Sequence, residues 1–362
     1  MGNERHPEIA TRLRERIVGG EFFPGERLPS RLELAEQLDV SSGTLQRAID
    51  SLADEGFVEG RGRHGTVVVE HPPFLCNYGI LMPCESAPAR PLLRSWQSML
   101  EAARQVFAEP PNRLSVFCEG DLQQSMASYQ AFLDDVAGHR LAGLIVPAVP
   151  VLHLSDLVAG RNGNLPVVTY VGDTFPGVAS VRQVTSTSAG ILDYLQARGR
   201  RRIGQLIPGA WYENPRYEAE FLHPLAKRGM HCERHWLQVV LPQIPQGVHN
   251  AAEVLARLPD GPDAIIIHDD NAVQEAIDGI QAAGKRIPED IVLVARGNFP
   301  WPDQYSAPVK RFGVDIMQLV RRAKDYIDAC RRGEDPEPII ELDMLEDDVA
   351  AVRQLETADL AV

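Results

Sequence analysis

Apolar residues in the first seventy positions follow a helical spacing and then change to a strand spacing. Ile9, Leu13 and Ile17 recur at intervals of four and predict an amphipathic helix, which the following glycine pair ends. β-branched runs come later and predict short strands. The elements predicted here are helices over residues 7–18, 31–38 and about 42–55, and strands over residues 57–59 and 66–69.

The second and third predicted helices are joined by a short turn. Ser30 and Glu33 have the spacing of a capping box that opens the second helix, and Ser41 or Ser42 can cap the third. Two helices joined in this way form a helix-turn-helix. The hairpin that follows has a flexible basic tip at residues 60–65 and is typical of a wing. The sequence therefore predicts an N-terminal winged helix-turn-helix of the α+β class.

Such a domain presents the N-terminal part of its last helix to base edges of double-stranded DNA. Its wing can reach the minor groove or phosphates, and Arg31, at the start of the second helix, is placed to meet a phosphate. On this basis the candidate DNA-binding residues are Arg31, Thr44, Gln46, Arg47, Arg61, Arg63 and His64.

Two alternative interpretations apply to this region. A solvated helix face accounts for Arg47 and Arg63 about as well as DNA binding does. The tip also matches G-x-G-x-x-G, the pattern of a dinucleotide-binding turn, but a helix precedes it and a β-branched run follows, which is the wrong context for that turn. Three arginines of the first helix, beside Glu8 and Glu15, are expected to form surface ion pairs: Arg12, Arg14 and Arg16.

Residues 7–69 resemble the DNA-binding domain of the GntR family. The shared residues are Phe23-x-Pro-Gly-Glu-Arg-Leu-Pro-Ser30, Glu33-Leu-Ala35, Leu38-x-Val-Ser41, Thr44, Ala48, Leu52, Glu55-Gly56-Phe57-Val58 and Gly65-Thr66. The resemblance implies DNA contacts by Arg31, Thr44, Gly65 and Thr66. It also places Ser42 where the family usually carries an arginine, and Gln46 and Arg47 depart from the family pattern. The operator sequences of other family members therefore cannot be assigned to this protein.

Beyond the wing, short β-branched runs alternate with helical segments. Two prolines in residues 70–73 predict a stiff, extended connector that few contacts cross. About nine strands follow, too many for one modest doubly wound domain, and a break at residues 172–188 separates two halves. We expect two α/β lobes with parallel sheets and a cleft between them. The predicted domains are residues 1–70 (winged helix), 71–76 (linker), 77–345 (two-lobed effector-binding and dimerisation domain) and 346–362 (tail).

The large domain resembles the sensor domain of LacI-family regulators and periplasmic binding proteins. Three groups of residues carry the resemblance: Leu141-Ala-Gly-Leu-Ile-Val146 with Leu165-Pro-Val-Val168; Leu195-x-x-x-Gly199-x-x-x-Ile203; and Pro262-Asp-Ala264, Asp269-Asp270, Gly284 and Ile287-Pro-Glu-Asp-Ile291. The resemblance implies a homodimer, a small-molecule effector in the cleft, and a final segment that crosses to the first lobe around residues 310–331 and ends in the second near 339–345. A GntR-type winged helix on such a sensor is the architecture of arabinose-responsive repressors.

The same resemblance implies that Arg216 and Asp270 contact a sugar. The aromatic residues Trp211, Trp301 and Tyr305 are predicted in loops at the cleft, where aromatic faces suit cyclic ligands. Alternatives stay open, because each aromatic ring can serve packing and Asp270 can cap the helix predicted after it. The acidic pair usual after the later strand is Gly297-Asn298 here, and a further family aspartate is missing, which counts against a sugar in particular. We therefore expect a small-molecule effector that is a sugar or a similar metabolite.

Charge changes this picture in one respect. The chain of 362 residues carries a net charge of −14, and residues 1–70 hold nine Arg and no Lys against thirteen Asp and Glu, a net of −4. DNA binding must then depend on where the arginines sit, not on bulk charge. The five cysteines form no CxxC pair, which disfavours a disulfide framework or zinc knuckle. No long apolar run or leader is present, so we expect a cytoplasmic protein without a membrane segment.

Enzymatic motifs are missing from the chain. No G-x-S-x-G, Walker loop or HExxH occurs, and the spaced pair His231 and His235 follows a helix-ending glycine, which disfavours a metal site. We therefore expect no catalytic residues, metal or cofactor. The favoured hypothesis is a ligand-responsive transcriptional regulator, expected to be a repressor. The alternative is a ligand-independent DNA-binding or interaction protein whose large domain serves only dimerisation.

Overall fold

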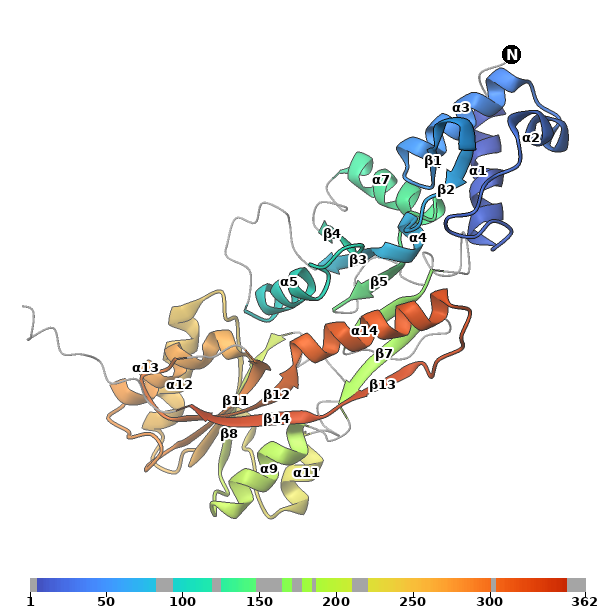
Figure 1. Cartoon of the computed structure of the whole chain (residues 1–362). Coiled ribbons are helices and arrows are strands. Elements are labelled where there is room, and N and C mark those ends of the chain that lie inside the picture. The colour runs from blue at the N-terminus through green and yellow to red at the C-terminus, as the bar shows by residue number, and fades with distance from the viewer. Residues whose placement is uncertain are drawn as a thin grey trace, which may run out of the picture. The chain divides into compact units, whose positions relative to one another are not determined.

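The computed structural model describes residues 5–82, 94–118, 125–147, 165–170, 178–183, 187–209, 221–300 and 304–349. The chain divides into two compact units (Figure 1). The first comprises residues 1–92, 100–182 and 320–340, and the second comprises residues 93–99, 183–319 and 341–362. The winged helix and one sheet belong to the first unit, and a second sheet belongs to the other.

The N-terminal region is a winged helix-turn-helix, as predicted. Ser30 accepts a hydrogen bond from the backbone N–H of Glu33, whose carboxylate accepts one from the N–H of Ser30, so the predicted capping box is formed. The side chain of Ser41 caps the next helix through the N–H of Thr44. The three helices are α1 (Arg5–Val18), α2 (Arg31–Leu38) and α3 (Ser42–Asp54), and the leucines fully buried among them are Leu13, Leu34, Leu45 and Leu52.

The wing is an antiparallel hairpin of β1 (Val58–Gly60) and β2 (Thr66–Val68). Its tip is a single 3-10 turn, η1 (Gly62–His64), after which Gly65 has φ +82°. The loop before α2 adds a third segment to this small sheet through an antiparallel bridge between Arg27 and Val67. The turn between α1 and α2 is thereby fixed to the wing.

The predicted linker, residues 71–76, is only partly extended: from Pro73 it is a turn of helix that packs on the winged helix, where few contacts were expected. It forms α4 (Pro73–Cys76), which begins with a proline, whose fixed φ suits a first helical turn. Phe74 lies in the hydrophobic core of the winged helix, with its ring stacked on that of Phe57 at 6.2 Å. Burial of this apolar ring against the winged helix holds the stretch as a turn of helix. Figure 1 shows α4 between the wing and β3.

The first sheet has six strands in the order β13-β7-β6-β5-β3-β4. Strands β4, β3, β5, β6 and β7 are parallel, and the region of the predicted break contains β7, which the sequence did not predict. One face packs on α7, and the other carries α14, whose Asp328 accepts a 2.5 Å hydrogen bond from the hydroxyl of Tyr78. The bounds are β3 (Asn77–Met82), α5 (Arg94–Val106), β4 (Arg113–Cys118), α7 (Met126–Ala137), β5 (Gly143–Val146), β6 (Val167–Tyr170) and β7 (Val178–Gln183).

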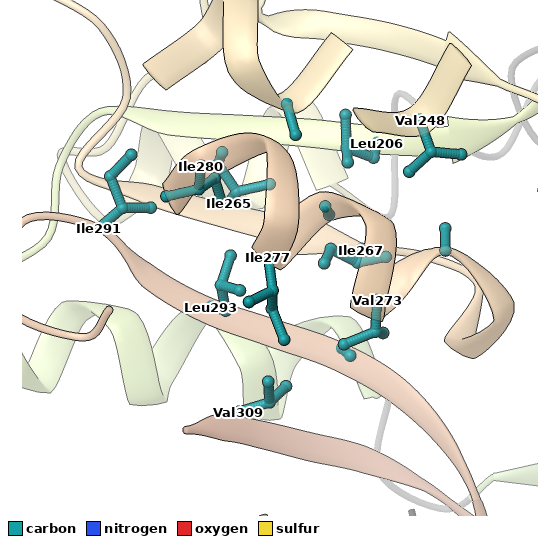
Figure 2. Packing of buried hydrophobic residues seen from close by; sticks show 14 of the residues in the cluster. Leu206, Val248, Ile265, Ile267, Val273, Ile277, Ile280, Ile291, Leu293 and Val309 are labelled. Atoms are coloured by element: carbon teal, nitrogen blue, oxygen red, sulfur yellow. The ribbon is translucent and has the colours of Figure 1, made fainter. Parts of the chain in front are cut away.

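The second sheet also has six strands, in the order β14-β12-β11-β10-β8-β9. All its pairs are parallel except β14 with β12. Helices α12 and α13 pack on one face over the isoleucines and valines in Figure 2, and α9 and α11 pack on the other. The bounds are α9 (Thr187–Ala197), β8 (Ile203–Pro208), α11 (His223–Lys227), η3 (Arg234–Trp236), β9 (Leu237–Val240), α12 (Pro245–Arg257), β10 (Ala264–Ile267), η4 (Asp270–Ala272), α13 (Val273–Ala282) and β11 (Val292–Phe299).

The course of the final segment, residues 309–349, differs in detail from the course that the resemblance implies. Residues 309–315 form β12 (Val309–Asp315) of the second sheet, where a crossing to the first lobe was expected. The crossing is made by α14 (Ile316–Arg331), β13 (Ile339–Leu342) lies in the first sheet, and β14 (Met344–Val349) returns to the second. At the end of α14, Arg331 donates hydrogen bonds to the carbonyls of Ala142 (2.6 Å) and Leu141 (3.2 Å), and burial lowers its pKa to about 10.

We expect Phe74→Ala to destabilise the winged helix by about 3 kcal/mol, because it empties space in a packed core. Hydrogen exchange of the α1 and α3 amides in the full chain measures this loss. Phe23→Ala is the matched control, since the Phe23 side chain is 65% exposed and that of Phe74 is 7% exposed. Equal protection in the two variants would show that α4 adds nothing to this domain.

Candidate DNA-binding and effector sites

The N-terminal turn of α3 presents a mixed set of side chains. Ser42 and Arg47 are exposed, and the Nε of Arg47 donates to the carbonyl of Gly43. Gln46 donates a 2.6 Å hydrogen bond to Asp50 on the same helix. Thr44, by contrast, is buried, with its hydroxyl 2.9 Å from that of Ser41. Among the predicted residues of α3, Ser42, Gln46 and Arg47 can therefore meet a ligand with their side chains, whereas Thr44 stabilises the cap.

The wing carries the other predicted contacts. Arg63 and His64 are exposed in the tip. Arg61 is exposed as well, but its Nε lies 2.7 Å from the carboxylate of Glu59, which offsets its charge. Gly65 is at a positive φ that suits glycine, and Thr66 is buried. The tip thus offers the guanidinium of Arg63 and the imidazole of His64.

The loop before α2 contributes an arginine that the sequence did not single out. Arg27 is exposed, and its bridge to Val67 sets it beside the wing. Arg31 is also exposed, at the first residue of α2. Sequence spacing gives no sign that Arg27 belongs with the wing, because the two are separated by the whole helix-turn-helix. In the sequence, this loop is marked only as part of the stretch Phe23–Ser30 that is shared with the GntR family.

The arginines of α1 do not all form the surface ion pairs that were predicted. Arg14 is buried, and its guanidinium binds the carboxylate of Glu55, the C-terminal cap of α3, at 2.5 Å and 3.1 Å. Arg140, beside the first sheet, lies 4.0 Å from the same carboxylate. Arg16 pairs with Glu21 at the surface. The prediction is wrong for Arg14, whose partner is distant in sequence and holds the two helices together.

Polar side chains gather where β10 and β11 end in the second unit. Asp269 accepts from the backbone N–H of Asn271 and so takes the capping role considered for Asp270. Asp270 is buried and accepts a 2.6 Å hydrogen bond from the side-chain amide of Asn298. Because the carboxyl ends of parallel strands are the usual binding edge of such sheets, this group is the candidate effector site.

His268, which directly follows β10, is buried next to these polar side chains in the sequence. Its Nε2 lies 2.9 Å from the amide oxygen of Gln205 on β8, and the ring of Phe221 meets it edge-on at 4.6 Å. Burial, with a smaller effect of Arg296, lowers the pKa of His268 well below its usual value. The imidazole is therefore neutral at pH 7 and acts as a hydrogen-bonding group, not as a charge.

Of the other four candidate effector contacts, the structure describes only Tyr305. Trp211, Arg216 and Trp301 lie outside the described residues. Tyr305 is 1% exposed and belongs to the core beneath α12 and α13, which favours the packing interpretation for it.

The histidine pair near β9 lies against a tryptophan. The rings of His231 and His235 both contact Trp236, at 5.3 Å and 5.8 Å. Within the described ranges, no three His, Cys, Asp or Glu side chains are grouped as metal ligands would be. The described cysteines Cys76, Cys118, Cys232 and Cys330 are free thiols. No helix in the described part of the chain has the length and apolar character needed to span a bilayer.

Comparison with known proteins assigns both domains. Residues 6–68 match the model of bacterial regulatory proteins of the gntR family, and residues 192–344 match a periplasmic-binding-protein-like domain. The chain joins a GntR-type DNA-binding domain to a periplasmic-binding-protein-like domain. The GntR-type domain is similar to an uncharacterized HTH-type transcriptional regulator, YisV, of Bacillus subtilis, with 38% identity over 64 residues, 18% of this chain and 13% of the relative.

A second relative of the GntR-type domain is the Exu regulon transcriptional regulator of Escherichia coli, with 33% identity over 100 residues, 25% of this chain and 38% of the relative. The chain thus spans well under half the length of these curated relatives.

The periplasmic-binding-protein-like domain has the fold of LacI-family regulators. One is a regulator from Arthrobacter in complex with lactose (TM-score 0.60, 14% identity, covering 75% of this chain and 97% of the other). Another is from Lactobacillus casei with bound glucose (TM-score 0.58, 18% identity, covering 76% and 99%).

The buried His268 predicts a pH dependence of stability for the periplasmic-binding-protein-like domain. Its pKa in the folded state lies below the unfolded value of about 6.5, so on acidification the unfolded chain takes up a proton that the folded chain does not. Stability should be full above pH 6.5 and fall below it, by up to about 1.4 kcal/mol per pH unit for this one proton.

Urea unfolding between pH 5 and 8 measures that slope. His268→Gln should flatten it, and His64→Gln, on the exposed wing tip, should leave it as in the unmodified protein. An unchanged slope in His268→Gln would contradict the assignment of a neutral imidazole.

Proposed function

We propose that the protein is a ligand-responsive, DNA-binding transcriptional regulator that acts in the cytoplasm as a repressor. The observation that carries the proposal is the complete GntR-type winged helix, with exposed side chains on α3, α2 and the wing, in one chain with a LacI-like sensor fold. The curated relatives of the winged helix are named as transcriptional regulators.

The DNA contacts divide by position. Ser42, Gln46 and Arg47 on α3 would read base edges in the major groove, and Arg31 would meet a phosphate. Arg61, Arg63 and His64 would follow the adjacent minor groove or backbone. Because Thr44 and Thr66 are buried and Gly65 has no side chain, these three would contribute through backbone N–H groups or through the local conformation.

The effector would bind where β10 and β11 end. Asp270 is our candidate contact there, with Asp269 and Asn298 around it, because carboxylates and amides accept from and donate to hydroxyl groups. Trp211, Arg216 and Trp301 remain predicted contacts. The LacI-family regulators of the same fold that hold lactose and glucose favour a sugar or another polyhydroxylated metabolite.

A homodimer would place two winged helices on a pseudo-palindromic operator. The exposed edges of the two sheets are candidate interfaces, since β4 and β9 each pair on one side only among the described strands. Val116 on β4, Val239 on β9 and the adjacent Leu241 are exposed apolar side chains at these edges. The effector would then shift the population between dimer conformations that differ in the spacing of the two winged helices.

Binding of the full chain to fragments of its own upstream DNA, with competitor DNA present, tests the function. We expect a competitor-resistant complex with two chains per operator. Arg47→Ala should weaken specific binding by about 1–3 kcal/mol and spare binding to random DNA, because it removes a base contact. Arg257→Ala, on the surface of α12, is the control. Affinity for upstream fragments no higher than for random DNA would contradict a local operator, and equal affinity in Arg47→Ala would contradict its role.

Thermal unfolding with a library of sugars and sugar derivatives tests the sensor. A compound that binds only the folded chain raises the melting temperature, and Asp270→Ala should abolish that rise. Should specific DNA binding persist with no compound raising the melting temperature, the alternative would hold: a ligand-independent DNA-binding protein whose large domain serves only dimerisation.

A further inference from the structure

Arg27 lies on a strand-like segment that the winged helix adds to its wing. Leu28 donates a 2.9 Å backbone hydrogen bond to Thr66, and Val68 donates one of 2.9 Å to Glu26. Leu28 points into the core and is buried, so its neighbour Arg27 points to the opposite, exposed face. The backbone that presents Arg27 is therefore as firmly held as the wing.

The guanidinium of Arg27 lies between the wing tip and the first turn of α2. A methyl group added at Gly65 would come within 3.0 Å of its Nε and 3.4 Å of its Nη2, so the side chain runs past the tip where a larger residue would stand. On the other side, its charge is close enough to Glu33 to add to the Ser30 hydrogen bonds that lower the pKa of that carboxyl. The side chain of Arg27 thus lies near two elements, the wing tip and α2, that carry proposed DNA contacts.

Arg27 acts on Glu33 only through a Coulombic effect without an ion pair, whereas several neighbouring arginines pair directly with a carboxylate. Arg14, Arg16 and Arg61 each hold a carboxylate within the winged helix. Among the residues that the structure describes, no carboxylate or carbonyl accepts a hydrogen bond from Arg27 and none forms an ion pair with it. In a segment with a net charge of −4, such a cation on the wing side is scarce.

We propose that Arg27 binds a phosphate of duplex DNA next to the wing, and that Gly65 lacks a side chain partly so that this guanidinium can lie along the tip. The proposal rests on the proposed DNA-binding function and extends it to a residue outside the recognition helix and hairpin. A phosphate is the expected partner because Arg27 sits at a strand edge beside the wing, not on the helix that enters the major groove. The contribution of Arg27 to binding affinity is therefore independent of the DNA sequence.

The test is binding of a random-sequence DNA duplex to the full chain across a salt series. Each phosphate contact adds about 0.9 to the magnitude of the slope of log affinity against log salt, so Arg27→Gln should reduce that magnitude by about 0.9. Arg27→Lys, which keeps the charge, should retain the slope. Arg12→Gln is the matched control: Arg12 is exposed on α1 beside Glu15, and the charge change is the same.

The outcomes separate this proposal from the function on which it rests. If the unmodified protein shows no salt-dependent binding to the duplex, DNA binding itself fails, and this proposal fails with it. If it binds and Arg27→Gln keeps the original slope, only the role of Arg27 is overturned. A lower melting temperature with an unchanged slope would make Arg27 a structural residue of the wing. Equal losses in Arg12→Gln and Arg27→Gln would reduce the effect to net charge.

Discussion

The shortness of the chain between the wing and the first sheet constrains the rest of the first unit. β2 ends at Val68 and β3 begins at Asn77, and the turn of α4 between them is packed into the winged-helix core through Phe74. Asn77 is itself held, because its side-chain amide donates 2.7 Å to the carbonyl of Arg140 and its carbonyl accepts 2.6 Å from Ala142. The connection is therefore held at both ends, by the burial of Phe74 and Leu75 on the winged-helix core and by the hydrogen bonds of Asn77 in the sheet that follows.

Charge placement decides what an acidic DNA-binding domain can do. Three carboxylates of the winged helix bind groups of the same domain: Glu55 joins α1 to the end of α3, the side chain of Glu33 completes a capping box, and Glu59 pairs with Arg61. These contacts neutralise acids that would otherwise repel phosphates. Arg63 on the wing, Arg31 on α2, Arg27 in the loop beside them and Arg47 on α3 are exposed, so a negatively charged domain carries cations next to its proposed DNA contacts.

Local signals in the sequence predicted much of this fold. The spacing of Leu45, Ile49 and Leu52, with a serine cap before them and a glycine after them, is sufficient to predict α3, because caps and apolar periodicity are properties of neighbouring residues. Strands β3 to β6 and β8 to β11 were predicted for the same reason, whereas β12, β13 and β14 were not predicted as strands. Strand β7 was missed since its sequence, with Ser180 and Arg182 among valines, lacks a continuous apolar run.

What sequence reasoning missed depends on contacts between distant segments. Proline pairs predict extended chain, and only the core of the winged helix makes α4 helical. The partner of Arg14 and the position of Arg27 beside Gly65 arise from tertiary packing across the whole domain. At the candidate effector site the sequence predicted Asp270 as a contact, but it could not tell which of two adjacent aspartates caps the turn, because that depends on backbone orientation.

Helix α14 has a mechanical consequence. It is one unbroken helix of 16 residues, roughly 24 Å long, whose first residues belong to the second unit and whose remainder belongs to the first. Its last residue donates hydrogen bonds to the carbonyls of Leu141 and Ala142, next to Arg140, whose guanidinium lies 4.0 Å from the carboxylate of Glu55, the C-cap residue of α3. A helix resists bending and twisting, so residues 316–319, which belong to the second unit, cannot turn about the helix axis independently of residues 320–331, which belong to the first.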